Sequence, residues 1–123
     1  MVNEFLYEDL SKEIINCFYK VYDELGNGFL ESVYEKSLMI ELKNNRLKAD
    51  DQKSLNVYYK NQLVGDFKAD IIVEDKIIIE IKALTKLTAQ HEAQLINYLK
   101  ATGIKVGLLV NFGEKLEFKR RIF

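Results

Sequence analysis

The chain has 123 residues, of which 48% are hydrophobic and 30% are charged, and its formal net charge is −1 at pH 7. These values are typical of a globular protein, so we expect a single domain over residues 1–123. The charge balance does not mark a general nucleic-acid binder. A single cysteine, Cys17, excludes an internal disulfide and a cysteine-rich zinc site.

Membrane attachment and export are not expected from the sequence. No apolar run approaches the roughly 20 residues that cross a bilayer. The acidic N-terminal segment MVNEFLYEDL lacks a signal-peptide pattern. We therefore expect a cytoplasmic protein without a membrane partner.

Two helices are predicted at the start of the chain. Apolar residues recur at steps of three and four from Leu6 to Leu25, which is typical of an amphipathic helix. The Gly-Asn-Gly sequence at 26–28 ends this helix, because glycine and asparagine adopt the left-handed cap conformation. A second helix is predicted from Leu30 to the two asparagines at 44 and 45.

Strands dominate the rest of the chain. The residues Leu55, Val57 and Tyr59 alternate with polar neighbours, which predicts a strand that ends at a turn over Asn61 and Gln62. A later helix has Thr88 as its N-cap and is closed by Gly103. The predicted elements after the second helix are strands at 54–60, 63–73 and 77–82, a helix at 89–101, a strand at 104–111 and a short edge strand at 116–118.

The order of these elements predicts an α/β fold with a mixed sheet. Three strands joined by short turns must run antiparallel to their neighbours. The strand that follows the helix at 89–101 returns over the sheet, so it can lie parallel to one of them. Helices then pack on the sheet as separate layers.

Three ionisable residues interrupt the apolar strand pair at 66–83: Asp70, Glu80 and Lys82. The many isoleucines around them indicate strands that are covered on both faces. A charge in such a place costs free energy unless it is paired or binds a metal. Glu80 and Lys82 are two residues apart, so they project from the same face of one strand.

The register of this strand pair decides whether the acids meet. A two-residue loop at Glu74 and Asp75 places Asp70 opposite Ile79. A three-residue loop places Asp70 opposite Glu80, and it also places Lys68 opposite Lys82. We predict the three-residue loop, or a bulge with the same effect. Strict alternation then puts Asp66, Lys68, Asp70 and Ile72 on one face of the second strand.

Two carboxylates that face each other repel unless a cation lies between them. Mg²⁺ or Mn²⁺ suits the pair, because hard cations favour oxygen ligands. The alternative is a structural cluster in which Lys68 and Lys82 neutralise the two acids. The sequence of this segment leaves both interpretations open.

The segment resembles the PD-(D/E)xK nuclease superfamily. Ala69-Asp70, nine intervening residues and Glu80-Ile81-Lys82 follow the motif, with Ala69 in place of its proline. The order helix, three strands, helix, strand from Leu30 to Asn111 is also that of the superfamily core. The resemblance implies a restriction-endonuclease-like core (α-β-β-β-α-β), a mixed β-sheet flanked by helices, with an extra N-terminal helix.

A closer resemblance covers almost the whole chain. The run from Gly28 to Tyr34 fits the GxxExxY signature of a small family grouped with these nucleases. The stretches QLINYLKATG from Gln94 and GLLVNFG from Gly107 are similar to the same family. Its biological role is poorly defined, so the resemblance implies the fold more than the function.

The resemblance also implies further site residues. Glu31 matches the signature glutamate, and in related nucleases a glutamate on the first core helix reaches the metal; Glu35, one turn on, competes for this role. Gln94 and Tyr98 are four residues apart on one helical face and resemble the Gln-x-x-x-Tyr element of RecB-like nucleases. The alternative is an ordinary polar helix face, and His91 is not expected to act as base or ligand.

The implied activity is metal-dependent hydrolysis of phosphodiester bonds in DNA, in preference to RNA. Asp70, Glu80, the Ile81 backbone carbonyl and Glu31 would hold Mg²⁺ or Mn²⁺. Lys82 would orient the attacking water, with Gln94 and Tyr98 beside it. The alternatives are a non-catalytic module that binds nucleic acid or protein, and an accessory subunit of a larger enzyme.

Two surface features bear on partners. Phe5 and Tyr7 on the first predicted helix offer an interface for a homodimer that acts on two strands. The cluster of Lys119, Arg120 and Arg121 is either a local basic patch or a solvated tail.

Overall fold

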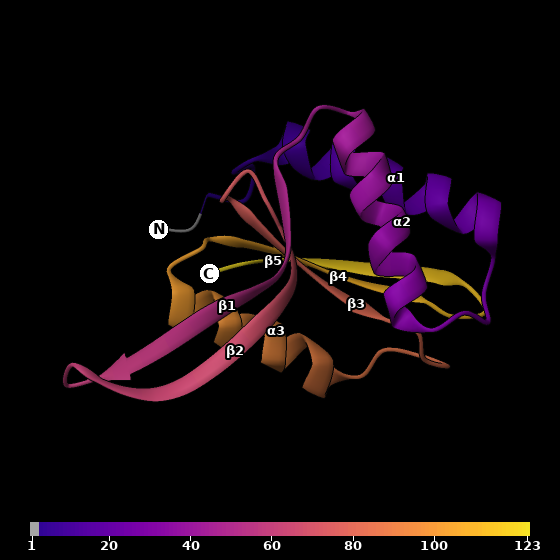
Figure 1. The fold of residues 1–123 in the computed structure, drawn as a ribbon. Coiled ribbons are helices and arrows are strands. Elements are labelled where there is room, and N and C mark those ends of the chain that lie inside the picture. The colour runs from indigo at the N-terminus through magenta and orange to yellow at the C-terminus, as the bar shows by residue number, and fades with distance from the viewer. Residues whose placement is uncertain (1–2) are drawn as a thin grey trace.

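The structure is a computed structural model that describes residues 3–123; Met1 and Val2, part of the segment that lacks a signal-peptide pattern, lie outside the described residues. Two helices come first, three strands follow, and a third helix connects to two further strands (Figure 1). The elements are α1 Glu8–Leu25, α2 Glu31–Asn44, β1 Ala49–Tyr59, β2 Gln62–Val73, β3 Ile77–Lys82, α3 Ala89–Thr102, β4 Val106–Phe112 and β5 Leu116–Ile122.

The five strands form one mixed sheet in the order β1-β2-β3-β4-β5. All neighbours are antiparallel except β3 and β4, which are parallel. The parallel pair is joined through α3, because a parallel connection needs a crossover element. The predicted α/β class is thus confirmed, and the arrangement is consistent with a restriction-endonuclease-like core preceded by an extra helix.

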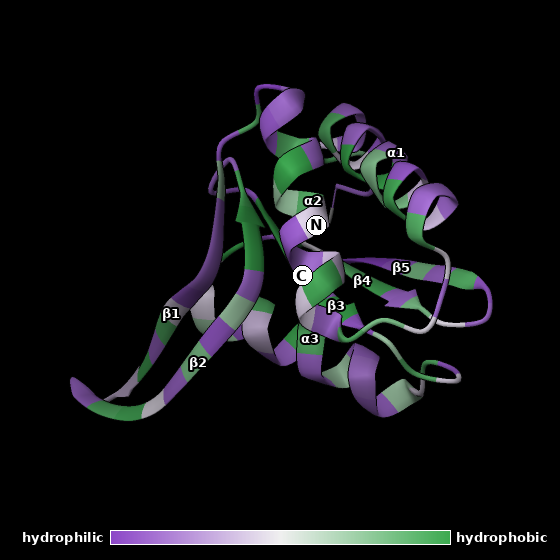
Figure 2. Cartoon of the chain, turned by 45° about the vertical axis from the view of Figure 1, so that its right-hand side comes forward, coloured by the Kyte–Doolittle hydropathy of each residue, from purple (hydrophilic) through white to green (hydrophobic). Residues whose placement is uncertain are grey.

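Helices cover both faces of the sheet. α1 and α2 lie on one face and α3 lies on the other (Figures 1 and 2). On β3, Ile77, Ile79 and Ile81 pack toward α1 and α2, whereas Ile78 packs toward α3. The isoleucine-rich sequence of β3 follows from this burial on both faces.

Several element bounds differ from the sequence prediction. β1 begins at Ala49 rather than Ser54, and β5 extends to Ile122 as an edge strand. The turn between β1 and β2 is centred on Lys60 and Asn61, whose φ angles are 49° and 64°. Two consecutive left-handed residues are typical of the hairpin turn that matches the twist of the strands, and alternation alone does not locate it.

The prediction that Phe5 and Tyr7 lie on an exposed part of the first helix is wrong. α1 begins at Glu8, so both residues precede it. Phe5 is 70% exposed, but Tyr7 packs against the core beneath α1, with the Lys76 ammonium 5.5 Å from its ring centroid. Tyr7 is therefore engaged within the chain.

The C-terminal basic cluster is not a solvated tail, because it forms the end of β5. Arg120 donates hydrogen bonds to the Ser11 hydroxyl at 3.1 Å and to the Glu4 carbonyl at 2.9 Å. Arg121 forms an ion pair with Glu92 of α3. These two arginines tie the last strand to both helical layers.

Within residues 3–123, none of the helices has both the length and the apolar character that a membrane crossing requires.

Candidate active site

The loop between β2 and β3 has three residues, as predicted. Val73 pairs with Ile77, Ile72 with Ile78 and Ile71 with Ile79. Glu74 and Asp75 have φ angles of 53° and 55°, and the Lys76 N–H donates to the Val73 carbonyl at 2.9 Å. If this pairing continued by one more residue pair, Asp70 would lie opposite Glu80. The paired region of β2 and β3 ends at Ile71 and Ile79, so Lys68 and Lys82 do not pair with each other.

Asp70 lies where the alternation of β2 slips by one residue. Ala69 and Ile72 both pack in the cluster beneath α3, whereas Ile71 packs toward α1 and α2. On β1, Gln52 lies opposite Asp70 with a φ of 50°, and the ladder is interrupted there. The prediction that Lys68 and Ile72 share a face is therefore wrong, because this kink turns the strand between them.

The kink directs the Asp70 carboxylate toward the edge of β3. Its Oδ2 atom accepts a hydrogen bond from the Ile81 N–H at 2.7 Å. The N–H and C=O of one strand residue point to the same side, so the Ile81 carbonyl also faces the β2 side. Asp70 and this carbonyl are thus two oxygen donors at the point where β2 and β3 separate.

Glu80 is 7% exposed and lies beside Asp70. Burial, followed by the Asp70 charge, raises the pKa of Glu80 to about 8. Among the side chains of residues 3–123 that are not exposed, the Glu80 Oε1 atom alone is buried without a hydrogen-bond partner. A buried carboxylate oxygen without a partner is costly, so this atom is suited to a ligand.

The donor set fits a hard divalent cation. Asp70, Glu80 and the Ile81 carbonyl offer oxygen atoms only, the type that Mg²⁺ and Mn²⁺ prefer. Lys82 follows on the same strand, half-buried, and its positive charge acts to lower the pKa of Glu80. The lysine therefore lies within electrostatic reach of the acid pair, where it can also face a phosphate.

A pocket of about 360 Å³ opens beside Asp70 and Ile81, and α2 supplies its other wall. Glu31 and Glu35 both line it. Gln52 Nε2 donates to Glu35 Oε1 at 2.6 Å and lies 3.5 Å from Asp70 Oδ1, so Gln52 connects Glu35 to Asp70. Burial raises the pKa of Glu35, and the Asp70 charge adds to the effect.

Glu31 is exposed and lines the same pocket, but its side chain forms no hydrogen bond with Asp70 or Glu80. Within residues 3–123, no three histidine, cysteine, aspartate or glutamate side chains converge as a metal-binding group. Glu80 lies next to Asp70, and Glu35 is connected to Asp70 through Gln52.

The two predicted site residues of α3 differ in their surroundings. Tyr98 is half-buried, and its ring centroid lies 5.1 Å from that of Phe67 on β2. Burial raises the pKa of Tyr98, with smaller contributions from Glu80 and Asp70, so it lies near the acid pair. Gln94 is exposed one turn earlier on the helix. His91 instead forms a capping box with Thr88 at the start of α3.

Tyr34, whose place in core or site the sequence leaves open, belongs to the core. Its side chain is fully buried and stacks on Phe112, with 4.4 Å between ring centroids and 3° between planes. Its hydroxyl donates to the Gly26 carbonyl at 2.6 Å and accepts from the Phe29 N–H at 3.3 Å. Tyr34 thus fixes the loop that leads into α2 and toward Glu31.

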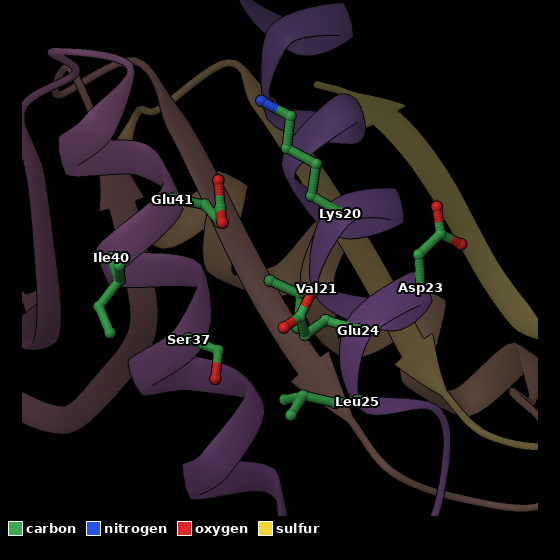
Figure 3. Close-up of a pocket in the computed structure, with 8 residues that line it drawn as sticks. All are labelled: Lys20, Val21, Asp23, Glu24, Leu25, Ser37, Ile40 and Glu41. Atoms are coloured by element: carbon green, nitrogen blue, oxygen red, sulfur yellow. The ribbon is translucent and has the colours of Figure 1, made fainter.

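A second pocket, of about 590 Å³, lies between α1 and α2, away from the acid pair (Figure 3). No strand residue lines it. Its lining mixes apolar Ile40 and Leu25 with the charged side chains of Lys20, Asp23 and Glu41. None of the predicted site residues lines this larger pocket, whereas Asp70, Ile81 and Glu31 line the smaller one at the strand edge.

Comparison with known proteins identifies a family for the chain. A family profile described as the PD-(D/E)XK nuclease superfamily matches residues 8–121. No curated protein matches the chain closely. Two solved structures share the fold: SSO0001, and an alkaline exonuclease (LHK-Exo) from Laribacter hongkongensis.

The likeness to SSO0001 has a TM-score of 0.58 and 24% identity, over 94% of this chain and 59% of that one. The likeness to the alkaline exonuclease has a TM-score of 0.51 and 13% identity, over 68% of this chain and 51% of that one. The chain thus spans little more than half the length of either structure. From the profile match, which covers nearly all of its length, the chain belongs to the PD-(D/E)XK nuclease superfamily.

Proposed function

We propose that the chain is a metal-dependent nuclease that hydrolyses phosphodiester bonds in DNA in preference to RNA. The observation that carries this proposal is the buried Glu80 Oε1 atom, which has no hydrogen-bond partner among the described residues and lies beside Asp70. Two adjacent acids and a lysine on the same strand form a site that gains stability from a divalent cation. Membership of the nuclease superfamily supports the same conclusion.

In this proposal Asp70, Glu80 and the Ile81 carbonyl hold Mg²⁺ or Mn²⁺. Glu31, which lines the adjoining pocket, completes the ligand set directly or through water. When bound, such a cation polarises the scissile phosphate and lowers the pKa of a bound water. The Ile81 N–H holds the Oδ2 atom of Asp70, and the Oδ1 atom lies 3.5 Å from Gln52 Nε2.

The other side chains act on the water and the phosphate. Lys82 orients the water and stabilises the negative charge that grows on phosphorus. Its charge lowers the pKa of Glu80, which supports a position of the ammonium near the acid pair. Tyr98 and Gln94 position the phosphate from α3, and the packing of Tyr98 on Phe67 restricts its ring.

We further propose that the chain belongs to the GxxExxY group within the superfamily. The signature from Gly28 to Tyr34 supports this, since each of its defined residues has a distinct place in the structure. Gly28 has a φ of 106°, which favours glycine, and Tyr34 is the buried anchor of the same loop. Glu31 is the signature residue at the mouth of the pocket.

The rival function is a non-catalytic module or an accessory subunit on the same fold. One observation favours it: no third acidic side chain joins Asp70 and Glu80 in a metal-binding group within the described residues. Metal dependence separates the two functions. A structural cluster needs no divalent cation for stability, whereas a nuclease site binds one between its acids.

The test is cleavage of end-labelled single-stranded, duplex and branched DNA, with Mg²⁺ or Mn²⁺ and with a chelator. Lys82→Ala removes the proposed phosphate-stabilising charge, and Lys86→Ala, an exposed lysine beyond the strand, is the matched control. We expect Lys82→Ala to lower the cleavage rate by about 10²–10³ and Lys86→Ala to leave it nearly unchanged.

Equal cleavage by the wild type and Lys82→Ala would show that another site, or a contaminant, cuts the DNA. Metal binding without cleavage on any substrate would favour the accessory subunit. If the stability and the nucleic-acid affinity of the protein are the same with divalent cations and with chelator, the non-catalytic module is favoured.

A further inference from the structure

The β1–β2 hairpin projects from the body of the molecule as a two-stranded ribbon, here called the ribbon and defined as residues 53–68 (Figures 1 and 2). Its base is held to α3 by Leu55, which is nearly buried, and by Phe67, which contacts Tyr98. Beyond these contacts both strands extend into solvent. An isolated two-stranded hairpin is only marginally stable in water, so the ribbon contributes little to the stability of the fold and is a candidate for a binding element.

The two faces of the ribbon differ. Leu55 pairs with Phe67 and both face α3. The pairs Ser54–Lys68, Asn56–Asp66 and Tyr58–Leu63 lie on the opposite face, and all six side chains are exposed. The next position toward the body is occupied by Gln52, opposite Asp70. One row of side chains therefore runs from the acid pair to the tip.

The tip is apolar for an exposed surface. Tyr58, Tyr59, Leu63 and Val64 are each between 58% and 64% exposed. The Lys60 ammonium lies 5.4 Å from the Tyr59 ring centroid. A group of exposed apolar residues at the end of a projecting element marks a contact surface.

Charge indicates the chemistry of the partner. The ribbon carries Lys53, Lys60 and Lys68 against a single acid, Asp66, although the whole chain has a net charge of −1. Lys53 forms a salt bridge with Asp75 at 3.5 Å, whereas Lys60 and Lys68 form no salt bridge among residues 3–123. A positive projection that leads to an acid pair fits a polyanion better than a second copy of this chain.

Shape selects among polyanions. The major groove of B-form DNA is about 12 Å wide and admits a two-stranded β-ribbon. The major groove of A-form RNA is too deep and narrow for side chains to read. The exposed side chains of Ser54 and Asn56 also are of types that bond base edges, and Leu63 can contact a thymine methyl group.

We propose that the ribbon lies in the major groove of duplex DNA and holds the duplex against the Asp70 pocket. This deepens the proposed function and rests on it, because it assigns duplex DNA as the substrate of that site. The seven residue steps from Leu63 to Asp70 span about 23 Å at the usual rise of a strand. The ribbon therefore contacts base pairs as far as about seven steps from the cleaved bond.

The experiment measures binding without cleavage, by fluorescence anisotropy of a labelled DNA duplex in chelator over a series of salt concentrations. The ribbon variant is Lys60→Ala/Lys68→Ala. The matched control is Lys20→Ala/Lys115→Ala, which removes two exposed lysines from α1 and the β4–β5 turn. A third variant, Tyr58→Ser/Leu63→Ser, changes the tip without altering charge, and thermal melting verifies that all variants fold.

We expect the ribbon variant to weaken duplex binding about tenfold and to reduce the salt slope by about 2, because each phosphate contact contributes about 0.9. The control should keep both the wild-type affinity and the wild-type slope. The tip variant should weaken binding with little change in slope. An RNA duplex of the same sequence should bind the wild type weakly, and the ribbon variant should not differ on it.

Equal losses in the ribbon variant and the control, equal affinity for the RNA duplex, or no binding of duplex DNA would each overturn the proposal. The proposal would also be wrong if the wild type is a dimer, and if Tyr58→Ser/Leu63→Ser makes it a monomer without changing its affinity for DNA. The tip would then bind a second copy of the chain. If the ribbon variant weakens DNA binding but the wild type never cleaves DNA, the nuclease proposal is wrong and the ribbon proposal stands. If the wild type and the ribbon variant cleave duplex DNA equally well, the ribbon proposal is wrong and the nuclease proposal stands.

Discussion

The Asp70 Oδ2 atom accepts a hydrogen bond from the backbone N–H of Ile81 at 2.7 Å. This side chain thus replaces the next ladder bond at the point where β2 leaves β3. The same bond fixes the carboxylate beside Glu80. Asp70 therefore lies where the pairing of β2 and β3 ends, and its carboxylate is held there. This explains why the candidate site lies at the point where the two strands separate.

Asp70→Asn should preserve the fold and weaken metal binding. The asparagine side-chain oxygen can still accept the bond from Ile81, so we expect a change in stability below about 1.5 kcal/mol. Loss of the negative charge removes one metal donor and should weaken Mn²⁺ binding by at least about tenfold. Isothermal titration and thermal melting measure the two effects. Wild-type affinity for Mn²⁺ in a folded variant would remove Asp70 from the ligand set.

Glu80 should make the metal-free protein less stable as pH rises. Its pKa is about 8 in the folded state against an ordinary value of 4.5, so the folded protein holds a proton that the unfolded chain releases between these values. The contribution of Glu80 to the free energy of unfolding should therefore be fully present below about pH 4.5, fall by a few kcal/mol between about pH 4.5 and about pH 8, and then level.

Urea unfolding in chelator across that range measures the effect, with Glu80→Gln as the comparison. The amide cannot ionise, so the variant should lose most of this slope and exceed the wild type in stability near pH 9. Other titrating groups contribute equally to both proteins. Identical slopes for the two would show that Glu80 is not held protonated by burial.

Tyr34→Phe tests whether the tyrosine of the signature stabilises the core and the loop before α2. The ring still stacks on Phe112, but the bonds to Gly26 and Phe29 are lost, which should cost about 1–3 kcal/mol of unfolding free energy. Tyr19→Phe is the control, because Tyr19 is half exposed and has no hydrogen bond from its hydroxyl among the described residues. Chemical unfolding measures both. A large loss of activity without a change in stability would place Tyr34 in the chemistry instead.

The sequence predicts the sheet and the order of its elements because these depend on local patterns. The isoleucine runs of β2 and β3 identify buried strands, and the three-residue loop follows from requiring Asp70 to meet Glu80. The sequence also identifies Asp70, Glu80 and Lys82 as unusual, since charged residues are costly among buried isoleucines.

Two features of the site escape prediction because they arise from tertiary geometry. The slip of alternation at Asp70 follows from a left-handed residue on the neighbouring strand, and no pattern within β2 reveals it. Gln52, which connects Glu35 to Asp70, lies on a stretch that the sequence assigns to no element. Its one signal is its position opposite Asp70, and this becomes visible only once the extent of β1 is known.

Gly113→Ala should destabilise the segment that follows Lys82. A β-carbon at Gly113 would meet the Leu84 carbonyl oxygen at 2.4 Å, and this backbone atom cannot rotate away. The same segment is held by Asn111, whose side chain bonds the Leu84 N–H at 2.8 Å and the Leu84 carbonyl at 3.0 Å. We expect a loss of about 1–3 kcal/mol in unfolding free energy, with lower cleavage activity as Ala83 and Lys82 shift.

Gly65→Ala is the matched control for this change. A β-carbon there meets Phe67 and Val57 at an ordinary 3.6 Å, so stability should change by less than about 1 kcal/mol. Thermal or urea unfolding of both variants gives the comparison of stability, and cleavage of labelled DNA by folded Gly113→Ala and by the wild type gives the second readout. If Gly113→Ala matches the wild type in both, the contact with Leu84 does not hold this segment, and the position of Lys82 must depend on β3 alone.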